Sequence, residues 1–346
     1  MQALRPRYVR VLVDWARLQP QAGAPPQLDA PADGCLRGLP PCGAYAGLRE
    51  ELQAIASEQR EHGGWPQVEM VVLGVPDWAA APGGGCERSD AGPWSRPITG
   101  DGLRAYGDLL GALVDLGRQT GAQLRWWSPW NEPNHPAFIS PQRARCSASA
   151  PSRAPDVYAQ LVRAARSALA AAPGDQRLVL GELSGHVTPT PHGSSIAELV
   201  RGLPDDVACA SRVWSQHAYA ELDPDPGEGD PVTALERALD ARPCTRGAHV
   251  WVTETGAGGR DPGADRPADD ASLRAGCQAQ DALLRRWAAD PRVDVALQYT
   301  FREDTAYPVG LADARLTRTY PTYDLWRAWG DRAPSAPPPP LPASCR

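Results

Sequence analysis

The most informative part of the sequence is Trp126-Trp127-Ser128-Pro129-Trp130-Asn131-Glu132-Pro133-Asn134. Its Trp-rich first half has the character of a short strand, and this strand ends on an Asn-Glu-Pro triplet. A second strand-like run, Val250-Trp251-Val252-Thr253-Glu254-Thr255-Gly256, also ends with a glutamate. Hydrolysis of a glycosidic bond requires a pair of carboxyl groups, and two strand ends could supply them. The C-terminal ends of strands are also where a (β/α)8 barrel carries its catalytic groups.

Each motif has a plainer interpretation when it is taken alone. Asn and Pro both mark turns and helix starts, so Asn-Glu-Pro could be a turn signal. Glu254 could be a solvated carboxylate at a strand end, which is the usual fate of a Glu. The two motifs together, in this order and within a barrel, favour a catalytic pair.

These motifs resemble those of the retaining glycoside hydrolases of clan A, most closely the cellulase-type family five and the xylosidase-type family thirty-nine. In that clan the Glu of the Asn-Glu-Pro triplet ends the fourth strand, and the second Glu ends the seventh. The resemblance implies a glycosidase that cleaves O-glycosidic bonds of a β-linked glycan by double displacement. Glu132 would be the acid/base and Glu254 the nucleophile, and no cofactor would be required.

The resemblance extends to groups around the pair. Arg10 matches a strand-two Arg that lies beside the nucleophile, although an Arg on an edge could instead face solvent. Asn131 matches the Asn that holds the sugar 2-hydroxyl. His217 and Tyr219 match a His-x-Tyr at the end of the sixth strand, where the Tyr hydroxyl contacts the nucleophile. We therefore expect all four near the sugar.

Aromatic side chains at strand ends are candidate platforms for sugar rings, because the C–H faces of a pyranose are apolar. Trp78 and Trp130 end the predicted third and fourth strands. The clan often has a Trp at the end of its eighth strand, and here Tyr299 or Phe301 would take its place. Glu182 also ends a strand, and substrate binding and solvation are equally consistent with it.

Short β-rich runs alternate with longer amphipathic runs, which predicts an α/β fold of the (β/α)8 TIM barrel type. We expect one catalytic domain over residues 1–332 and a Pro-rich tail over 333–346 that is extended or disordered. The predicted strands are 8–15, 68–75, 124–130, 177–181, 212–217, 249–254 and 293–301, and the predicted helices are 45–62, 102–120, 155–172, 195–203, 231–241, 270–290 and 322–329.

The predicted strands are one fewer than a closed barrel needs. The run from Val9 to Pro20 resembles the second strand of the clan and not its first. We therefore expect that the first strand is missing before Met1, together with a signal peptide. Coding sequence in frame upstream of Met1 would confirm this expectation, whereas an in-frame stop codon immediately before Met1 would contradict it.

Composition narrows the class of partner. With 346 residues, 42% of them hydrophobic, the chain can bury a large core. A net charge of −6 without a basic run excludes the electrostatic footprint of a nucleic-acid binder. No apolar run approaches the roughly 18 residues that span a bilayer. The expected partner is a neutral oligosaccharide or polysaccharide, bound by a monomer, with neither nucleic acid nor membrane involved.

The sequence is also compatible with two other functional classes. The main alternative is a non-catalytic carbohydrate-binding barrel, against which the retention of both glutamates argues. The other is a metal-dependent barrel hydrolase, but the six histidines show no metal-ligand spacing, so no metal site is expected.

The eight cysteines have no Cys-x-x-Cys spacing and favour disulfides in an oxidising compartment, hence a secreted or cell-envelope protein. Free buried thiols are the alternative, and connectivity cannot be proved from sequence. The pairings that we consider are Cys35 with Cys42 within one loop, Cys86 with Cys146 at the catalytic rim, Cys209 with Cys244 at the opposite end, and Cys277 with Cys345 between the tail and the body.

Overall fold

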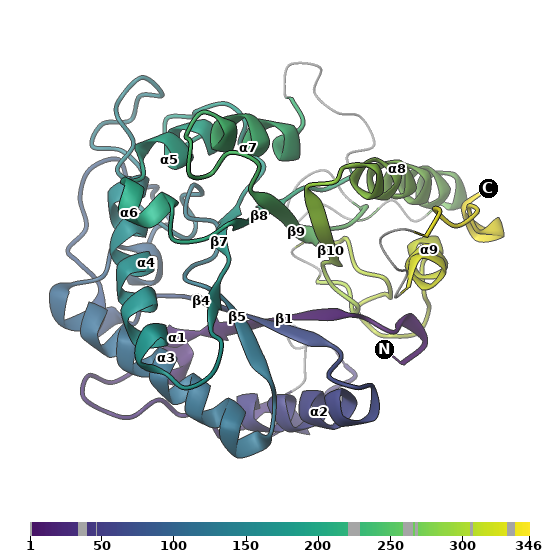
Figure 1. The fold of residues 1–346 in the computed structure, drawn as a ribbon, viewed down its shortest axis with the longest axis horizontal. Helices are drawn as coiled ribbons and strands as arrows, with labels where there is room; N and C mark the ends of the chain where they lie inside the picture. The colour runs from purple at the N-terminus through teal and green to yellow at the C-terminus, as the bar shows by residue number, and fades with distance from the viewer. Residues whose placement is uncertain are drawn as a thin grey trace.

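The structure is a computed structural model that describes residues 2–33, 40–45, 47–220, 229–258, 266, 269–304, 307–330 and 336–346. Its centre is a set of parallel strands, and helices surround them (Figure 1).

The strands form two four-stranded parallel sheets. The first has the order β1 (Tyr8–Asp14), β4 (Gln67–Leu73), β5 (Leu124–Ser128) and β6 (Arg177–Leu178). The second has the order β10 (Val293–Gln298), β9 (His249–Thr255), β8 (Val213–His217) and β7 (Leu180–Leu183). Only Val179 separates β6 from β7, so one run of chain pairs with β5 and then with β8. All seven predicted strands are thereby confirmed, with small shifts at their ends.

Contacts across the interior show that the two sheets curve around a common axis. The Tyr8 and Trp251 rings meet edge to face with centroids 5.2 Å apart, and the Trp126 and Trp251 rings meet at 4.7 Å. These residues lie on β1, β5 and β9, which are not neighbours in either sheet, so only the concave side allows the contacts. Val179 and Val295 complete this small apolar plug. Strands buried on both faces explain the near-continuous apolar runs in the sequence.

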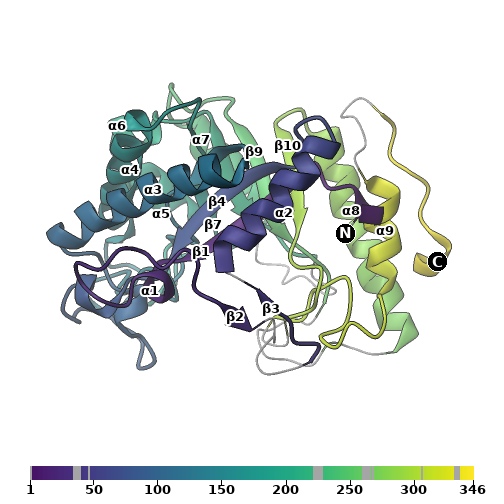
Figure 2. The same cartoon turned by 90° about the horizontal axis from the view of Figure 1, so that it is seen from below.

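The predicted helices are also confirmed, and they pack their apolar faces on the outside of the strands. Figure 2 shows α2 and α3 side by side against this surface. The main helices are α2 (Gly47–Glu61), α3 (Gly100–Thr120), α4 (Ala154–Ala171), α5 (Ile196–Gly202), α7 (Pro231–Asp240), α8 (Asp270–Ala289) and α9 (Pro321–Trp329). Among the described helices, none is both long and apolar enough to cross a bilayer.

Several short elements complete the described chain. They are the helical turns η1 (Gln2–Leu4), α1 (Trp15–Leu18), η2 (Asp77–Ala79), η3 (Pro93–Ser95), α6 (Asp205–Ala208) and η4 (Ala343–Cys345), and the antiparallel pair β2 (Ala32–Asp33) and β3 (Ala44–Tyr45).

The circle of strands is open between β1 and β10. No ladder joins these two strands, both of which are fully described. A cavity of about 1000 Å³ lies at this seam, and apolar residues of α2, α8 and α9, including Ile55, Leu284 and Trp326, line it. Leu12 of β1 is 44% exposed there. The structure therefore shows a parallel α/β array with one open side, and the closed eight-stranded barrel remains a prediction.

Three predicted disulfides are confirmed: Cys86–Cys146, Cys209–Cys244 and Cys277–Cys345. The predicted Cys35–Cys42 pairing lies outside the described residues, because Cys35 is not among them. Cys345 is fully buried, and Gln278 of α8 donates a hydrogen bond to its carbonyl oxygen at 2.8 Å. The described part of the Pro-rich tail, residues 336–346, is thus held on α8 and is not a free end.

Removal of the bridge between the tail and α8 should destabilise the protein. For the double variant Cys277→Ala/Cys345→Ala we expect the free energy of unfolding to fall by about 2–4 kcal/mol, because the bridge closes a long loop of the unfolded chain. Urea unfolding of both proteins measures the difference. An unchanged unfolding midpoint in the double variant would contradict the expectation.

Candidate functional site

The predicted catalytic residues meet at the C-terminal ends of the strands. Glu132 follows β5, Glu254 lies at the end of β9, and His217 ends β8. His217 and Glu254 are register partners in the ladder between β8 and β9, so parallel pairing alone places them side by side. Arg10 of β1 reaches the same centre from the other sheet.

Arg10 binds three acidic or amide groups at once. Its Nη1 donates to Glu254 Oε1 at 2.6 Å. Its Nη2 donates to Asn131 Oδ1 and to Glu182 Oε2, each at 2.5 Å. The guanidinium side chain is only 7% exposed. Its alternative position, facing solvent on an edge strand, is therefore wrong.

His217 links three carboxylates. Its Nδ1 lies 2.8 Å from Glu132 Oε1 and 3.4 Å from Glu254 Oε2, and its Nε2 lies 3.0 Å from Glu182 Oε2. Tyr219 donates its hydroxyl proton to Glu254 Oε2 at 2.5 Å. Glu254 therefore receives hydrogen bonds from Arg10 and Tyr219 at its two oxygens.

One oxygen each of Glu132 and Glu254 and one nitrogen of His217 lie within 4.8 Å of one another. Such a spacing suits both a metal and a pair of catalytic carboxyls. A second described cluster, Cys86, Cys146 and His192, offers no thiolate because its sulfurs form a disulfide.

The charges of the site depend on each other. Burial would lower the pKa of Arg10, but the carboxylates of Glu182 and Glu254 more than offset this effect and the pKa is raised. Burial would likewise lower the pKa of His217, but Glu254, Glu132 and Glu182 raise it to about 10. Both groups are therefore cations at neutral pH.

The His217 cation in turn acts on Glu132. Burial would raise the pKa of Glu132, but the hydrogen bond and charge of His217 outweigh burial and lower it. In the resting site the shared proton therefore lies on His217 Nδ1 and is hydrogen-bonded to Glu132 Oε1. Burial, with the charge of Glu254 second, raises the pKa of Tyr219 well above its usual value, so its hydroxyl remains a donor.

Glu69 is a neutral carboxyl beneath this network. It lies on β4 opposite Arg10 in the ladder with β1, it is fully buried, and neither of its carboxyl oxygens has a hydrogen-bond partner of normal geometry. Burial, followed by the charge of Glu182, raises its pKa well above the usual range. A protonated Glu69 avoids a second buried negative charge beside Glu182.

Two site residues have a left-handed backbone. Glu132 has φ 37° and Glu182 has φ 53°, a region that costs a residue with a side chain about 1 kcal/mol. Gly181, directly before Glu182, has φ 104°, and a Cβ there would lie 2.5 Å from the Ser215 carbonyl oxygen. Glycine therefore lets β7 approach β8 closely enough for Glu182 to reach His217.

The aromatic residues predicted to stack on sugar rings differ in their exposure. Trp130 is 1% exposed, and its indole N–H donates to the Phe138 carbonyl at 2.9 Å. It is a core residue in this structure, and its expected role as a platform is wrong. Trp78 is half-buried and packs edge to face on Trp15. Tyr299 is half-buried beside Tyr307, whose ring also meets that of Tyr219 at 4.8 Å.

Three further residues contribute to the site or its surroundings: Glu182, Glu69 and Tyr307. Glu182 is fully buried, so neither of its expected roles, substrate binding or solvation, holds. Glu69 is absent from the predicted site, although a charged residue inside the apolar run Val68-Glu69-Met70-Val71 is a usable sequence signal. Tyr307 carried no such signal, because a loop alone brings it to Tyr219.

Comparisons with known proteins show the fold. No family model matches the chain, and no curated protein matches it in sequence. Among solved structures, it is similar to the GH53 catalytic domain of Ignisphaera aggregans, with a TM-score of 0.50, 15% identity and coverage of 92% of this chain and 84% of that one. It is also similar to an exo-beta-1,4-mannosidase from Opitutaceae bacterium strain TAV5, with a TM-score of 0.50, 15% identity and coverage of 95% and 53%.

A conserved exported protein from Bacteroides fragilis is similar as well, with a TM-score of 0.53, 12% identity and coverage of 86% of this chain. The chain spans 60% of the length of that protein. At these identities the likeness is one of fold: the chain has the α/β fold of TIM-barrel glycosidases.

The charge network can be tested without an activity assay. Glu182→Gln removes one carboxylate beside His217, so the imidazolium should lose its proton at lower pH. We expect the pKa of His217 to fall from about 10 by roughly 1–3 units. A pH titration of the ¹³C-labelled histidine signals by NMR measures it.

The matched control is Glu69→Gln. Because Glu69 is already neutral, replacing its carboxyl by an amide should move the pKa of His217 by less than about half a unit. An equal fall in both variants would show that Glu69 is ionised in the parent protein.

Proposed function

We propose that the chain is a retaining glycoside hydrolase that cleaves a β-linked glycan, with Glu254 as nucleophile and Glu132 as acid/base. The observation that carries the proposal is the approach of the two carboxylates, with one oxygen of each within 4.8 Å of the other. Retaining enzymes place their carboxyls about 5 Å apart, whereas inverting enzymes leave room for a water between them at roughly 6.5–9.5 Å.

In the first step, a Glu254 oxygen attacks the anomeric carbon and the bond to the leaving oxygen breaks. The leaving oxygen takes a proton from Glu132, which receives it from His217 Nδ1 along their 2.8 Å hydrogen bond. The products of this step are a glycosyl ester on Glu254, a free leaving group, a neutral His217 and an ionised Glu132.

In the second step, a water molecule attacks the anomeric carbon and Glu132 takes its proton. The ester bond breaks, Glu254 is again a carboxylate, and the proton returns from Glu132 to His217. In the intermediate Glu254 is an uncharged ester, so it no longer raises the proton affinity of His217. His217 is therefore neutral while Glu132 acts as the base.

Arg10 and Tyr219 serve the nucleophile in this scheme. Their hydrogen bonds of 2.6 and 2.5 Å occupy both Glu254 oxygens and fix the carboxylate plane. The cation of Arg10 thus lies against the oxygen Oε1 of the proposed nucleophile. Arg10 Nη2 donates to Asn131 Oδ1 as well as to Glu182 Oε2, and this bond fixes the Asn131 side chain. The amide nitrogen of Asn131 would then donate to a sugar hydroxyl.

The proposed substrate is an oligosaccharide or polysaccharide, and the proposed location is outside the cytoplasm. Three disulfides support an oxidising compartment. The similarity to an exported protein is consistent with this location.

The proposal includes a closed barrel completed by one further strand in the seam. The free edges of β1 and β10 flank a cavity of about 1000 Å³ whose helical walls are mainly apolar, with Glu51 of α2 as an exception. Such walls suit a strand packed on both faces.

Variants of the two glutamates should fail at different steps. Glu254→Ala should abolish turnover because no glycosyl ester can form, and added azide should give a product of inverted anomeric configuration. Glu132→Ala should lower kcat/KM by about 10²–10⁴-fold on substrates with poor leaving groups. Activated aryl β-glycosides should still form the ester, and azide should then speed its release as a product of retained configuration.

Steady-state kinetics and NMR of the products measure these outcomes. His249→Ala is the control, because His249 lies at the start of β9, is half exposed and pairs only with Asp294 in the described network. Near-normal activity of both glutamate variants on natural and activated substrates would refute the proposed roles. Sugar binding without turnover by the parent would favour a non-catalytic barrel.

A further inference from the structure

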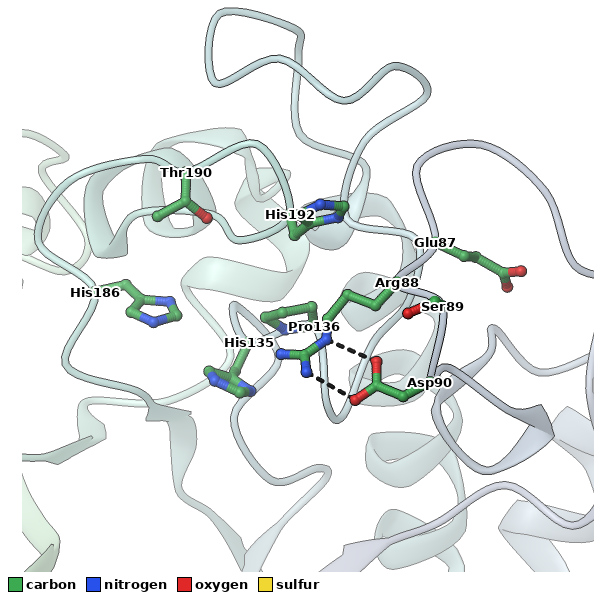
Figure 3. A pocket seen from close by; sticks show the side chains of 9 residues that line it. All are labelled: Glu87, Arg88, Ser89, Asp90, His135, Pro136, His186, Thr190 and His192. Atoms are coloured by element: carbon green, nitrogen blue, oxygen red, sulfur yellow. Dashed lines mark hydrogen bonds and ion pairs between the residues drawn. The ribbon is translucent and has the colours of Figure 1, made fainter. Parts of the chain in front are cut away.

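A polar cavity lies beside Glu132, which contacts the lining residue His135. It has a volume of about 560 Å³, within the range of small-molecule sites. Three loops form it: the loop after β4 gives Arg88 and Asp90, the loop after β5 gives His135, and the loop after β7 gives His186 and other residues (Figure 3). None of these residues belongs to the catalytic network described above, except that His135 Nδ1 lies 4.0 Å from Glu132 Oε2.

The cavity is held by a fixed framework. Arg143 is fully buried behind it, and its guanidinium donates to the carbonyl oxygens of Thr190 and Gly193, each at 3.0 Å, and to Glu198 at 2.7 Å. The Arg143 carbonyl accepts the amide of Cys86 at 2.9 Å, and Cys86 is bonded to Cys146. One buried cation and one disulfide thus connect the three loops, which is the support that a preorganised binding site requires.

The imidazoles offer hydrogen bonds without a fixed charge. His135 Nδ1 accepts the Ala137 amide at 3.1 Å, so the proton of the neutral ring lies on Nε2. Burial lowers the pKa of His135, which keeps the ring neutral. The His186 ring stacks on His135 with centroids 5.0 Å apart, and its Nδ1 is buried without a partner among the described residues.

The charged residues of the cavity compensate one another. Arg88 forms a two-point ion pair with Asp90, at 2.8 and 2.7 Å, and Figure 3 shows this pair facing the imidazoles. Glu87 pairs with Arg96 at 2.9 Å. No uncompensated cation of the described lining is left for an anion, and two carboxylates would repel one.

We infer that this cavity binds a neutral sugar residue on the leaving-group side of the bond that is cleaved. The inference rests on the proposed function. The leaving oxygen receives its proton at Glu132, so the group attached to it must lie beyond Glu132, where His135 forms the wall. A lining of imidazoles, hydroxyls and a paired guanidinium supplies donors and acceptors for a polyhydroxyl ligand, and Pro136 adds one apolar surface for the C–H face of a sugar. The natural leaving group is therefore a sugar.

Kinetics with His186→Ala tests this assignment. The two substrates are an aryl glycoside and an oligosaccharide that carry the same sugar on the non-leaving side. The ratio of their kcat/KM values, oligosaccharide over aryl glycoside, should fall by about tenfold, since loss of one pocket contact costs roughly that factor. His249→Ala is the matched control and should leave the ratio unchanged. An unchanged ratio in His186→Ala, with both substrates cleaved, overturns the inference and leaves the proposed function standing.

Binding gives a second test that does not depend on turnover. At pH 7, glucose, xylose and mannose are added separately to the parent protein, and the histidine ring signals are followed by NMR. At least one of these sugars should shift the signals of His186 and His135 while that of His249 stays in place, and glucuronate at equal concentration should shift them less. A stronger response to glucuronate, or no response to any of the three neutral sugars, overturns the inference. If no glycoside is cleaved, a positive binding result separates failure of the catalytic proposal from failure of the sugar site.

Discussion

The site depends on one buried cation. Arg10 enters from the first sheet and forms ion pairs with Glu254 and Glu182 of the second sheet. Without it, His217 alone would offset the carboxylates of Glu254, Glu182 and Glu132 within this network. A buried carboxylate without a counter-charge costs several kcal/mol. The raised pKa of Glu69 follows from the same limit, since burial penalises a further negative charge beside Glu182. The ion pairs of Arg10 thus connect the two sheets.

The secondary structure could be predicted because its signals are local. Each strand is a short apolar run bounded by turn residues, and each helix has apolar residues at helical spacing, as in Leu109, Leu113 and Leu116 of α3. The closed barrel could not be predicted as firmly, because closure depends on what pairs with the free edges of β1 and β10, the first and last of the described strands in the two sheets. Strand pairing at these edges is a long-range property, and local sequence patterns do not predict it.

The same contrast between local and long-range signals explains which site residues could be predicted. Motifs at the ends of adjacent strands, such as His217 and Glu254, were placed correctly because parallel register brings them together. Trp130 was misplaced because its turn directs the ring into the core, where Phe138 accepts its N–H. The cavity of His135 and His186 was not foreseen, since it needs three loops whose contacts are set by Arg143 and a disulfide.

The junction at Val179 has a consequence for local stability. On that side the two sheets are joined by continuous backbone, whereas on the opposite side β1 and β10 have free edges and share no ladder. Local openings of the native state begin where backbone groups lack partners. Amide hydrogen exchange should therefore be fastest along the outer edges of β1 and β10 and slowest in β4, β5, β8 and β9. The aromatic contact of Tyr8 with Trp251 limits this opening from the interior. Local unfolding should therefore begin at the edges of β1 and β10, whereas the side that contains Val179 stays folded longest.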